Sequence, residues 1–298
     1  MIKVGVVGVG MMGQHHARVY SELNCELVGV ADKNLEQAKK IGELYSTNYY
    51  EGYQELLDKV DAVSIVVPTS LHRQVAMDFI KRGVHCLVEK PIASTIEEAK
   101  EMIREAEGKG VKLMVGHVER FNPAVTKLKE LVEKGALGKL ILISTRRVGP
   151  FVSRIRDVGI IIDSATHDID IARYLVGRDP INVYAKSGRV KSEKEDHAIV
   201  VLDFGDVAAS IEVNWFTPHK VRSLVATGTE GIAYLDYIKQ ELDVHSGGEK
   251  IVPKIDKVEP LKLELKHFLD CIQRNTKPLV DGHEGLKVLE IAIKASKR

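Results

Sequence analysis

The stretch IKVGVVGVGMMGQHHARVYSEL, residues 2–23, decides how the first part of this 298-residue chain folds. It opens with a mostly apolar, valine-rich run that is typical of a buried strand and closes with the spacing of an amphipathic helix. Between them lies the pattern G-x-G-x-x-G. Gly8 permits a tight turn, Gly10 lets the backbone approach a pyrophosphate, and Gly13 lets the helix lie close to the strand. The stretch therefore predicts the first strand, turn and helix of a dinucleotide-binding domain.

The same alternation of short apolar runs and amphipathic runs continues to about residue 115. The runs that follow are ELVGVA, NLEQAKKIGELY, DAVSIVV, HRQVAMDFIKRG, VHCLVE, TIEEAKEMIREAEGKG and KLMVG. Strands that alternate with helices pair in parallel and carry helices on both faces of their sheet. We therefore expect an α/β fold that begins with a doubly wound parallel sheet, the Rossmann arrangement.

From about Lys139 onward, strand-like runs follow one another with turn residues between them. The runs are KLILISTRRV, INVYAKSGRV, HAIVVLDF, VAASIEVNWF, VRSLVATG and GIAYLDY, and helices are expected at 163–176, 261–274 and 283–296. This order predicts an α+β domain with an open, mainly antiparallel sheet. We expect residues 1–120 to form the dinucleotide-binding Rossmann domain and residues 121–298 to form an α+β domain for substrate binding and oligomerisation.

Composition narrows the class of protein. Apolar residues make up 44% and charged residues 29% of the chain, and the formal net charge is +1, so neither a nucleic-acid surface nor a polybasic membrane patch is indicated. No apolar run approaches the roughly 18 residues of a membrane span, and no cleavable signal pattern follows Met1, so the cytoplasm and a small-molecule partner are expected. Cys25, Cys86 and Cys271 lie far apart without C-x-x-C spacing, which predicts neither disulfides nor a metal site.

Asp32 marks the second part of the predicted nucleotide site. It follows the run ELVGVA, where a carboxylate can accept hydrogen bonds from the ribose hydroxyls of NAD. The same charge repels the 2′-phosphate of NADP and so favours NAD, although Lys33 beside it weakens this preference and leaves NADP open. The alternative interpretation is a glycine-rich turn followed by a solvated aspartate.

A lysine follows the strand-like run VHCLVE in the tripeptide E-K-P, residues 89–91. The carboxyl ends of the strands in a doubly wound sheet border the ligand crevice, so Lys90 is expected near the reacting end of the cofactor. Taken alone, a lysine before a proline is more often a residue of a surface loop. The motifs that accompany it decide between these interpretations.

The stretch IIIDSATHDID, residues 160–170, places three aspartates and a histidine directly behind an apolar run. If Asp163 begins a helix, His167 and Asp170 share one stripe with it, while Asp168 points elsewhere. In the alternative interpretation Asp163 merely caps the helix and His167 packs in the core.

The order of these motifs resembles the Gfo/Idh/MocA oxidoreductase family along essentially the whole chain. GVGMMGQHH is similar to the family's nucleotide loop, with its following histidine at His16. VVPTSLH, residues 66–72, is similar to the family's P-x-x-x-H segment beside the nicotinamide, with Thr69 where Asn is frequent. VHCLVEKP and VGHVERFNP match its lysine strand and R-F-x-P region, and a single Gly159 precedes Asp163 where the family often has two or three glycines.

The resemblance implies a dehydrogenase that oxidises a secondary hydroxyl by hydride transfer to nicotinamide, with Lys90, Asp163 and His167 as its catalytic residues. A base must take the hydroxyl proton, and a histidine such as His167 suits this role near neutral pH. Lys90 as an ammonium would stabilise alkoxide character on the same oxygen, and Asp163 would orient Lys90 or a neighbouring hydroxyl. The predicted cofactor contacts are Gly8, Gly10, Met11, Met12, Gly13, Asp32, Lys33, Pro68, Thr69, His72, Glu89 and Lys90.

The expected substrate is charged. The arginines that precede the predicted catalytic helix are Arg146, Arg147, Arg154 and Arg156. Guanidinium groups suit phosphates better than neutral polyols, which favours a nucleotide sugar such as UDP-N-acetylglucosamine, oxidised at its 3-hydroxyl. In NWFTPHKVR, Trp215 could stack on a sugar or base, and the residues that could reach a diphosphate are His219, Lys220 and Arg222. The predicted substrate contacts are His117, Arg120, Arg154, Arg156, Asp163, His167 and Trp215, and no metal is expected.

Several alternatives stay open at this point. The arginines could face solvent or form ion pairs, and Trp215 could cover the sheet against a neighbouring subunit. IDSATHDIDIAR is similar to the inositol-dehydrogenase branch, whereas GHVERFNPAV and NWFTPHKVR are similar to the UDP-N-acetylglucosamine branch, so a cyclitol 2-dehydrogenase or an aldose oxidoreductase is an alternative. A non-catalytic dinucleotide-sensing regulator is another. A homo-oligomer, dimer or tetramer, is expected through the C-terminal sheet.

Overall fold

The computed structural model describes residues 1–151 and 158–297, which form two compact units. Unit 1 comprises Met1–His117 and Leu261–Leu286, and unit 2 comprises Val118–Pro260 and Lys287–Arg298. The chain thus returns to unit 1 after the sheet of unit 2, whereas the sequence analysis assigned all of residues 121–298 to the second domain.

Packing explains this return. The helix α7 (Pro260–Arg274) carries Lys262, whose ammonium lies 2.9 Å from the carboxylate of Glu22 in unit 1. The first turn of α8 (Gly282–Ser296) lies so close to unit 1 that a Cβ on Gly285 would meet Val115 at 2.5 Å. The order of elements along the sequence does not determine which sheet a helix covers, so this part of the arrangement was not predictable from the pattern.

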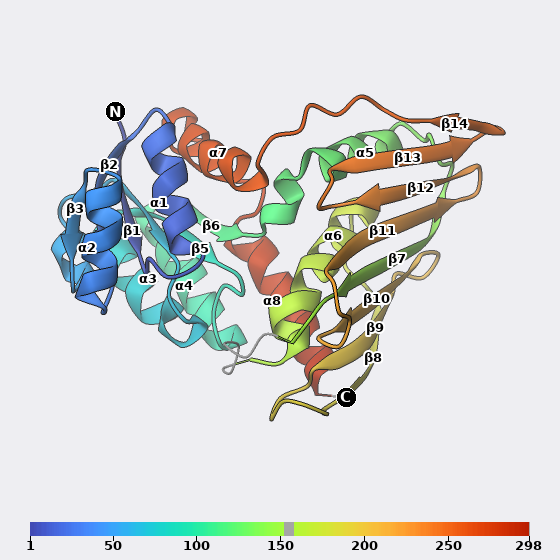
Figure 1. Ribbon diagram of the computed structural model, residues 1–298, viewed down its shortest axis with the longest axis horizontal. Coiled ribbons are helices and arrows are strands. Elements are labelled where there is room, and N and C mark those ends of the chain that lie inside the picture. The colour runs from blue at the N-terminus through green and yellow to red at the C-terminus, as the bar shows by residue number, and fades with distance from the viewer. Residues whose placement is uncertain (152–157, 298) are drawn as a thin grey trace. The chain divides into compact units, whose positions relative to one another are not determined.

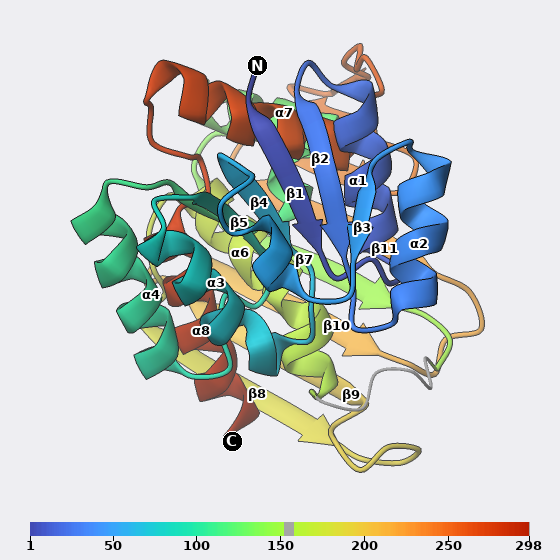
Figure 2. The same ribbon diagram turned by 90° about the vertical axis from the view of Figure 1, so that its left-hand side faces the viewer.

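Unit 1 is built on a six-stranded parallel sheet with the order β3-β2-β1-β4-β5-β6. Its strands are β1 (Lys3–Val7), β2 (Glu26–Ala31), β3 (Asn48–Tyr50), β4 (Ala62–Ile65), β5 (His85–Glu89) and β6 (Leu113–Gly116). The helices that connect them are α1 (Gly13–Glu22), α2 (Leu35–Leu44), α3 (His72–Lys81) and α4 (Ile96–Lys109). Right-handed crossovers that run in opposite directions from β1 place α1 and α2 on one face and α3 and α4 on the other (Figure 2). The predicted doubly wound sheet is confirmed.

Local signals explain how these helices begin. The side chain of Asn34 caps α2 by accepting a hydrogen bond from the backbone three residues on. α4 begins with a capping box in which Thr95 and Glu98 accept hydrogen bonds from each other's backbone. α1 differs, because Met12 makes no side-chain capping bond and the first turn holds no acidic residue. The positive end of α1 is therefore not neutralised by its own side chains.

Unit 2 contains an eight-stranded sheet with the order β14-β13-β12-β11-β7-β10-β9-β8. Its strands are β7 (Leu140–Val148), β8 (Asn182–Gly188), β9 (His197–Asp203), β10 (Ala208–Asn214), β11 (Val221–Gly228), β12 (Gly231–Asp236), β13 (Glu241–Ser246) and β14 (Glu249–Ile251). Neighbouring strands run antiparallel except β7 and β10, which pair in parallel. The predicted open, mainly antiparallel sheet is confirmed.

Helices cover one face of this sheet (Figure 1). They are α5 (Pro123–Glu133), α6 (Thr166–Val176) and the later turns of α8. Alternate residues of β9, namely Ala198, Val200 and Leu202, belong to the core on that side, as the two-residue period of a strand requires. Within the described part of the chain, no helix has the length and apolar character that crossing a membrane requires.

Candidate active site

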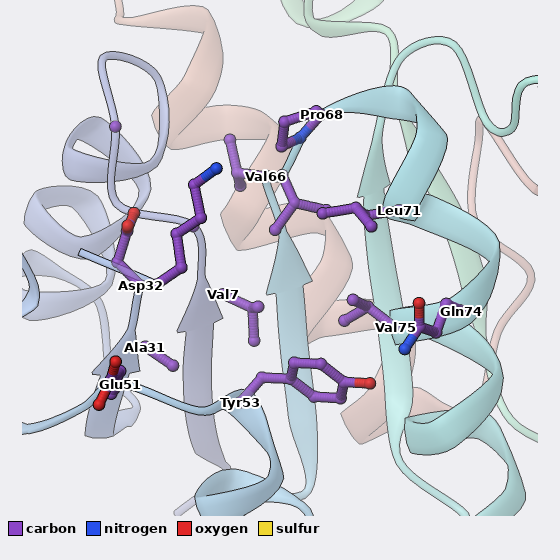
Figure 3. A pocket seen from close by; sticks show the side chains of 14 residues that line it. Val7, Ala31, Asp32, Glu51, Tyr53, Val66, Pro68, Leu71, Gln74 and Val75 are labelled. Atoms are coloured by element: carbon purple, nitrogen blue, oxygen red, sulfur yellow. The ribbon is translucent and has the colours of Figure 1, made fainter. Parts of the chain in front are cut away.

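A pocket of about 300 Å³ lies at the carboxyl ends of β1, β2 and β4, where the strand order of unit 1 reverses. We call it the nucleotide pocket, and its lining includes Gly8, Gly10, Asp32, Lys33, Tyr53, Pro68, Leu71 and Gln74. Figure 3 shows Asp32 and Glu51 on one side of it, with Leu71 and Gln74 on the other. In doubly wound sheets this reversal point is where nucleotides bind.

The three glycines of the loop serve different needs. Gly8 has a φ of 83°, in the left-handed region, and a Cβ there would lie 2.5 Å from the carbonyl oxygen of Val66. A Cβ on Gly13 would lie 1.8 Å from the carbonyl oxygen of Gly8, so the helix could not begin this close to the loop. A Cβ on Gly10 would meet no protein atom within 4 Å, although Gly10 lines the pocket. Packing requires Gly8 and Gly13, whereas Gly10 leaves room for a ligand.

Asp32 is fixed at the edge of the pocket by the loop itself. Its Oδ2 accepts a hydrogen bond from Val9 N (2.8 Å), and its Oδ1 accepts one from Asn34 N (2.9 Å). Gln37 Nε2 donates to Val9 O (2.7 Å), so the backbone N and the backbone O of Val9 are both bound by residues that follow β2. The carboxylate position, the open side of Gly10 and the uncompensated start of α1 fit the ribose and pyrophosphate of NAD.

Some residues of this pocket carry no signal in the sequence. Tyr53 and Gln74 line it but belong to no motif, and Leu71 occupies one of the unspecified positions of the P-x-x-x-H segment. Tyr53 Oη donates to Asp78 Oδ2 (2.7 Å), and burial together with this carboxylate raises the pKa of Tyr53 to about 12. Among the predicted contacts, Pro68 lines the pocket and Thr69 begins the short 3-10 turn Thr69–Leu71 beside it.

Lys90 follows the last residue of β5, as predicted. Its backbone N donates to Glu89 Oε2 (3.2 Å), and Glu89 Oε1 lies 3.2 Å from His16 Nε2. His72, a predicted cofactor contact, is buried, and each of its ring nitrogens lies 2.9 Å from a carbonyl oxygen, those of Pro91 and Val67. The polar atoms of His72 are therefore engaged by the chain itself, which leaves no ring nitrogen for the predicted contact.

Residues 160–170 of unit 2 begin with a π-helical turn, Ile161–Ala165, and α6 starts only at Thr166. The helix predicted at 163–176 therefore starts three residues late, with Asp163 in the π turn, where its Oδ2 accepts a hydrogen bond from Ser164 Oγ (2.9 Å). Asp163 and His167 are partly exposed, whereas Asp168 and Asp170 are buried. Isolated π turns in helices occur often at functional sites.

The two buried aspartates form ion pairs with arginines. Asp170 accepts hydrogen bonds from Arg120 at 2.6 to 3.0 Å, and Asp168 Oδ2 accepts one from Arg147 Nε (2.8 Å). Arg147 Nη1 also donates to Glu119 (3.1 Å). Burial raises the pKa of Asp168, and the charge of Arg147 opposes this shift. Of the predicted stripe, only Asp163 and His167 are partly exposed, because Asp170 is buried in its ion pair with Arg120.

These ion pairs correct several substrate predictions. Arg120 is buried in its pair with Asp170, so its guanidinium has no free position for a phosphate, whereas Arg146 is half-exposed and its Nε donates to Glu212 (3.0 Å). Trp215 is 5% exposed and belongs to the core of unit 2, with its ring edge-on to Phe151 at 6.0 Å. Arg154 and Arg156 lie outside the described residues. The remaining predicted contact, His117, is buried directly after β6.

Arg222 was a minor element of the prediction but has the setting of an anion-binding residue. It is half-buried on β11, and its Nη1 donates to Val148 O (2.7 Å) and Val221 O (2.9 Å). Burial and the charge of Arg147 lower the pKa of Arg222, while Asp163 is among the nearby acids that oppose this shift. With the described residues Arg222 forms no ion pair, so its other guanidinium donors are available to a ligand. No group of His, Cys, Asp and Glu among residues 1–151 and 158–297 is arranged to hold a metal ion.

Known proteins are similar to this chain in sequence and in structure. Residues 2–117 match the family described as "Oxidoreductase family, NAD-binding Rossmann fold", and residues 125–234 match the "GFO/IDH/MocA C-terminal domain". The chain is 31% identical to the UDP-N-acetylglucosamine 3-dehydrogenase of Acidithiobacillus ferrooxidans, over 98% of this chain and 95% of that protein. It is also 31% identical to the scyllo-inositol 2-dehydrogenase (NAD(+)) of Bacillus subtilis, over 99% of this chain and 93% of that protein.

The folds agree equally well. A solved structure of the UDP-N-acetylglucosamine 3-dehydrogenase from Acidithiobacillus ferrooxidans superimposes with a TM-score of 0.93 at 29% identity, covering 99% of this chain and 96% of that one. The motifs, both domain matches and these whole-chain similarities lead to one assignment. The chain belongs to the Gfo/Idh/MocA family of oxidoreductases and carries that family's NAD-binding Rossmann fold.

Proposed function

We propose that this oxidoreductase uses NAD to oxidise a secondary hydroxyl of a nucleotide sugar, and that the 3-hydroxyl of UDP-N-acetylglucosamine is its target. The observation that carries this proposal is the setting of Arg222, a half-buried cation with unused donors whose charge is felt by Asp163. Asp163 and His167 would act on a hydroxyl, and Arg222 would bind a phosphate. This combination suits a sugar that carries an anionic group. The similarity to the UDP-N-acetylglucosamine 3-dehydrogenase supports the same choice.

The nucleotide pocket would hold the cofactor. Asp32 would accept hydrogen bonds from the adenosine ribose, and the backbone around Gly10, with the start of α1, would bind the pyrophosphate. Bound NAD would supply the hydride acceptor. The protein's own contribution is to orient the sugar and to move the hydroxyl proton.

The proposed division of labour follows from the residue types. His167, partly exposed on α6, would accept the hydroxyl proton, and Lys90 would hydrogen-bond the same oxygen while negative charge develops on it. Asp163 would orient the hydroxyl from the π turn. The carbon would lose its hydrogen as hydride and the oxygen its proton, which leaves a ketone at that position of the sugar.

Steady-state reduction of NAD by a substrate panel tests the proposal. UDP-N-acetylglucosamine should reduce NAD, and Arg222→Met should raise its KM by about tenfold or more with little change in kcat, because a lost phosphate contact weakens ground-state binding. Arg146→Met is the matched control, since Arg146 lies on the neighbouring strand and already has Glu212 as a partner. An equal change of KM in both variants would contradict the role of Arg222.

A cyclitol is the second candidate substrate. The scyllo-inositol 2-dehydrogenase of Bacillus subtilis is as similar in sequence as the nucleotide-sugar relative, and its substrate carries no charge. Steady reduction of NAD with scyllo- or myo-inositol and none with nucleotide sugars would favour this assignment. In that case Arg222→Met should leave KM nearly unchanged.

We also propose that a second copy of this chain covers the open face of the eight-stranded sheet. Tyr184, Ile199 and Tyr234 are exposed on strands of this sheet, opposite the helix-covered side. The same face carries both Arg146 and Glu212, so two copies related by a twofold axis could pair opposite charges. Light scattering of Ile199→Glu should show a smaller species than the wild type.

A further inference from the structure

Lys90 is flanked in the sequence by two residues that are each in contact with a buried histidine. Glu89 precedes it, and its Oε1 lies 3.2 Å from His16 Nε2. Pro91 follows it, and its carbonyl oxygen lies 2.9 Å from His72 Nδ1. His16 belongs to the first turn of α1 and His72 begins α3, so the two helices reach this segment from opposite faces of the parallel sheet.

His16 is one link in a buried chain of hydrogen bonds. Tyr20 Oη lies 2.9 Å from Ser64 Oγ, and Ser64 Oγ lies 3.1 Å from His16 Nδ1. With a neutral imidazole at His16 and an ionised Glu89, one arrangement of protons matches every group: Tyr20 donates to Ser64, Ser64 donates to Nδ1, and Nε2 donates to Glu89. The chain of donors therefore ends on the carboxylate next to Lys90.

The Glu89 carboxylate is built into this position. Its second oxygen, Oε2, accepts a hydrogen bond from Lys90 N (3.2 Å). On the paired strand β6, a Cβ on Gly116 would lie only 3.1 Å from Glu89 Cδ, so glycine makes room for the carboxylate. Burial raises the pKa of Glu89, but the hydrogen bond from His16 and the charge of Lys90 outweigh it, and the pKa is lowered. The group stays an acceptor for both partners.

His72 has a different balance of donors and acceptors. Both of its ring nitrogens lie 2.9 Å from carbonyl oxygens, which only accept hydrogen bonds. Burial lowers the pKa of His72, so the ring carries one proton near neutral pH and donates to one carbonyl at a time. One of these carbonyls belongs to Pro91, and the other belongs to Val67 in the wall of the nucleotide pocket. His72 therefore connects the Lys90 segment to that wall.

We propose that His16 and His72 are positioning residues that fix the segment 89–91 from its two ends and thereby place the Lys90 ammonium. The inference rests on the catalytic role proposed for Lys90. Neither histidine has a ring nitrogen left for the cofactor or the sugar, so both act through Glu89 and Pro91 rather than on the reacting atoms. Displacing a catalytic group by about 1 Å can cost up to about a hundredfold in rate.

The geometry predicts opposite preferences for amide substitutes at the two positions. The side-chain amide of glutamine can replace the donor at Nε2, and that of asparagine can replace the donor at Nδ1. His16→Gln should keep the donor to Glu89 and retain kcat within about threefold, whereas His16→Asn should lose about tenfold or more. His72→Asn should keep the donor to Pro91 and retain kcat within about threefold. His72→Gln should lose that donor, and its kcat should fall by about tenfold or more, as in His16→Asn.

Each variant is also measured for its KM, its dissociation constant for NAD and its melting temperature. We expect the loss to fall on kcat, with NAD binding changed by less than about threefold, because all the ring nitrogens of both histidines already have partners within the chain. If the histidines only fill space, the order of the two amides follows size and is the same at both positions. That result, or equal kcat in all four variants, would overturn the inference.

Spectroscopy of the wild type without cofactor supplies a readout that is independent of activity. The ¹⁵N spectrum of histidine-labelled protein should show His16 protonated at Nε2 and bare at Nδ1, with the resonance identified by its loss in His16→Gln or His16→Asn. Protonation at Nδ1 would break the donor chain and overturn the role of His16.

Lys90→Met separates this inference from the proposed function. If Lys90→Met is inactive and the amide variants show no opposite preference, the positioning role fails while the proposed function stands. If Lys90→Met keeps full activity, the catalytic role of Lys90 fails and the positioning role fails with it. If none of the tested sugars or cyclitols supports NAD reduction by the wild-type protein, the proposed function fails. Protonation of His16 at Nε2 would still support its contact with Glu89.

Discussion

At the scale of single residues, the loop of unit 1 shows what a sequence motif can and cannot specify. Gly8 and Gly13 are needed by the packing of the chain, whereas a Cβ on Gly10 would meet no protein atom within 4 Å. The motif correctly predicted the tight turn at Gly8 and the close approach of the helix at Gly13, whereas the pyrophosphate contact at Gly10 stays a prediction. Tyr53 and Gln74 were not predictable, because they reach the same pocket from segments that carry no pattern.

Asp32 should determine the choice between NAD and NADP. Its carboxylate is held by Val9 N and Asn34 N at the edge of the pocket, so it cannot turn away from a 2′-phosphate. We expect wild-type protein to bind NAD more tightly than NADP in calorimetric titrations. Asp32→Ser should reduce or reverse this preference, since it removes the charge beside Lys33. Equal affinity for the two cofactors in the wild type would show that Lys33 outweighs the carboxylate.

His72 should contribute to the pH dependence of stability. Burial lowers its pKa in the folded protein, so the unfolded chain binds the proton more readily. Its contribution to the free energy of unfolding is present above the unfolded pKa, about 6.5, and is lost as the pH falls below it. We expect His72→Asn to melt with a weaker dependence on pH between about 5 and 7 than the wild type. His283→Asn is the control, because His283 is an exposed residue paired with Glu107.

At the scale of elements, α6 shows where prediction from the sequence ended. The run behind Asp163 was correctly predicted to be helical, but a π turn at Ile161–Ala165 shifts the start of α6 to Thr166. Periodicity alone could not reveal that Asp168 and Asp170 face the interior, because their partners Arg147 and Arg120 come from segments 20 to 50 residues earlier. Pairing across such distances is a property of the fold rather than of the local pattern.

The Arg147–Asp168 pair should contribute strongly to the attachment of α6 to β7. Both side chains are almost completely buried, with exposures of 6% and 1%. Asp168→Asn leaves the buried guanidinium with Glu119 as its remaining acid, and we expect a loss of about 3 to 5 kcal/mol in the free energy of unfolding. Asp243→Asn, which removes the partner of Lys250 in an ion pair exposed on both sides, should cost at most about 1 kcal/mol. Denaturant titrations of both variants measure this difference, and equal losses would contradict it.

At the scale of the whole molecule, the two sheets were predictable and the course of the chain between them was not. Alternation of apolar runs with helices gave the parallel sheet, and consecutive strand runs gave the antiparallel one. The return of Leu261–Leu286 to unit 1 depends on which surface the last helices bury, and the apolar stripe of a helix does not specify the sheet against which it packs. The order of motifs therefore indicated the family more reliably than it indicated the domain boundaries.

The central claim is that the chain transfers hydride from C3 of a UDP-linked sugar to NAD, with Lys90 and His167 acting on the hydroxyl. Mass spectrometry of the cofactor after turnover of UDP-N-acetylglucosamine deuterated at C3 tests it most directly. We predict one deuterium in the reduced cofactor with wild-type protein, and a rate about a hundredfold or more lower with Lys90→Met or His167→Ala. Reduced cofactor without deuterium, or no reduction by this sugar, would contradict the claim.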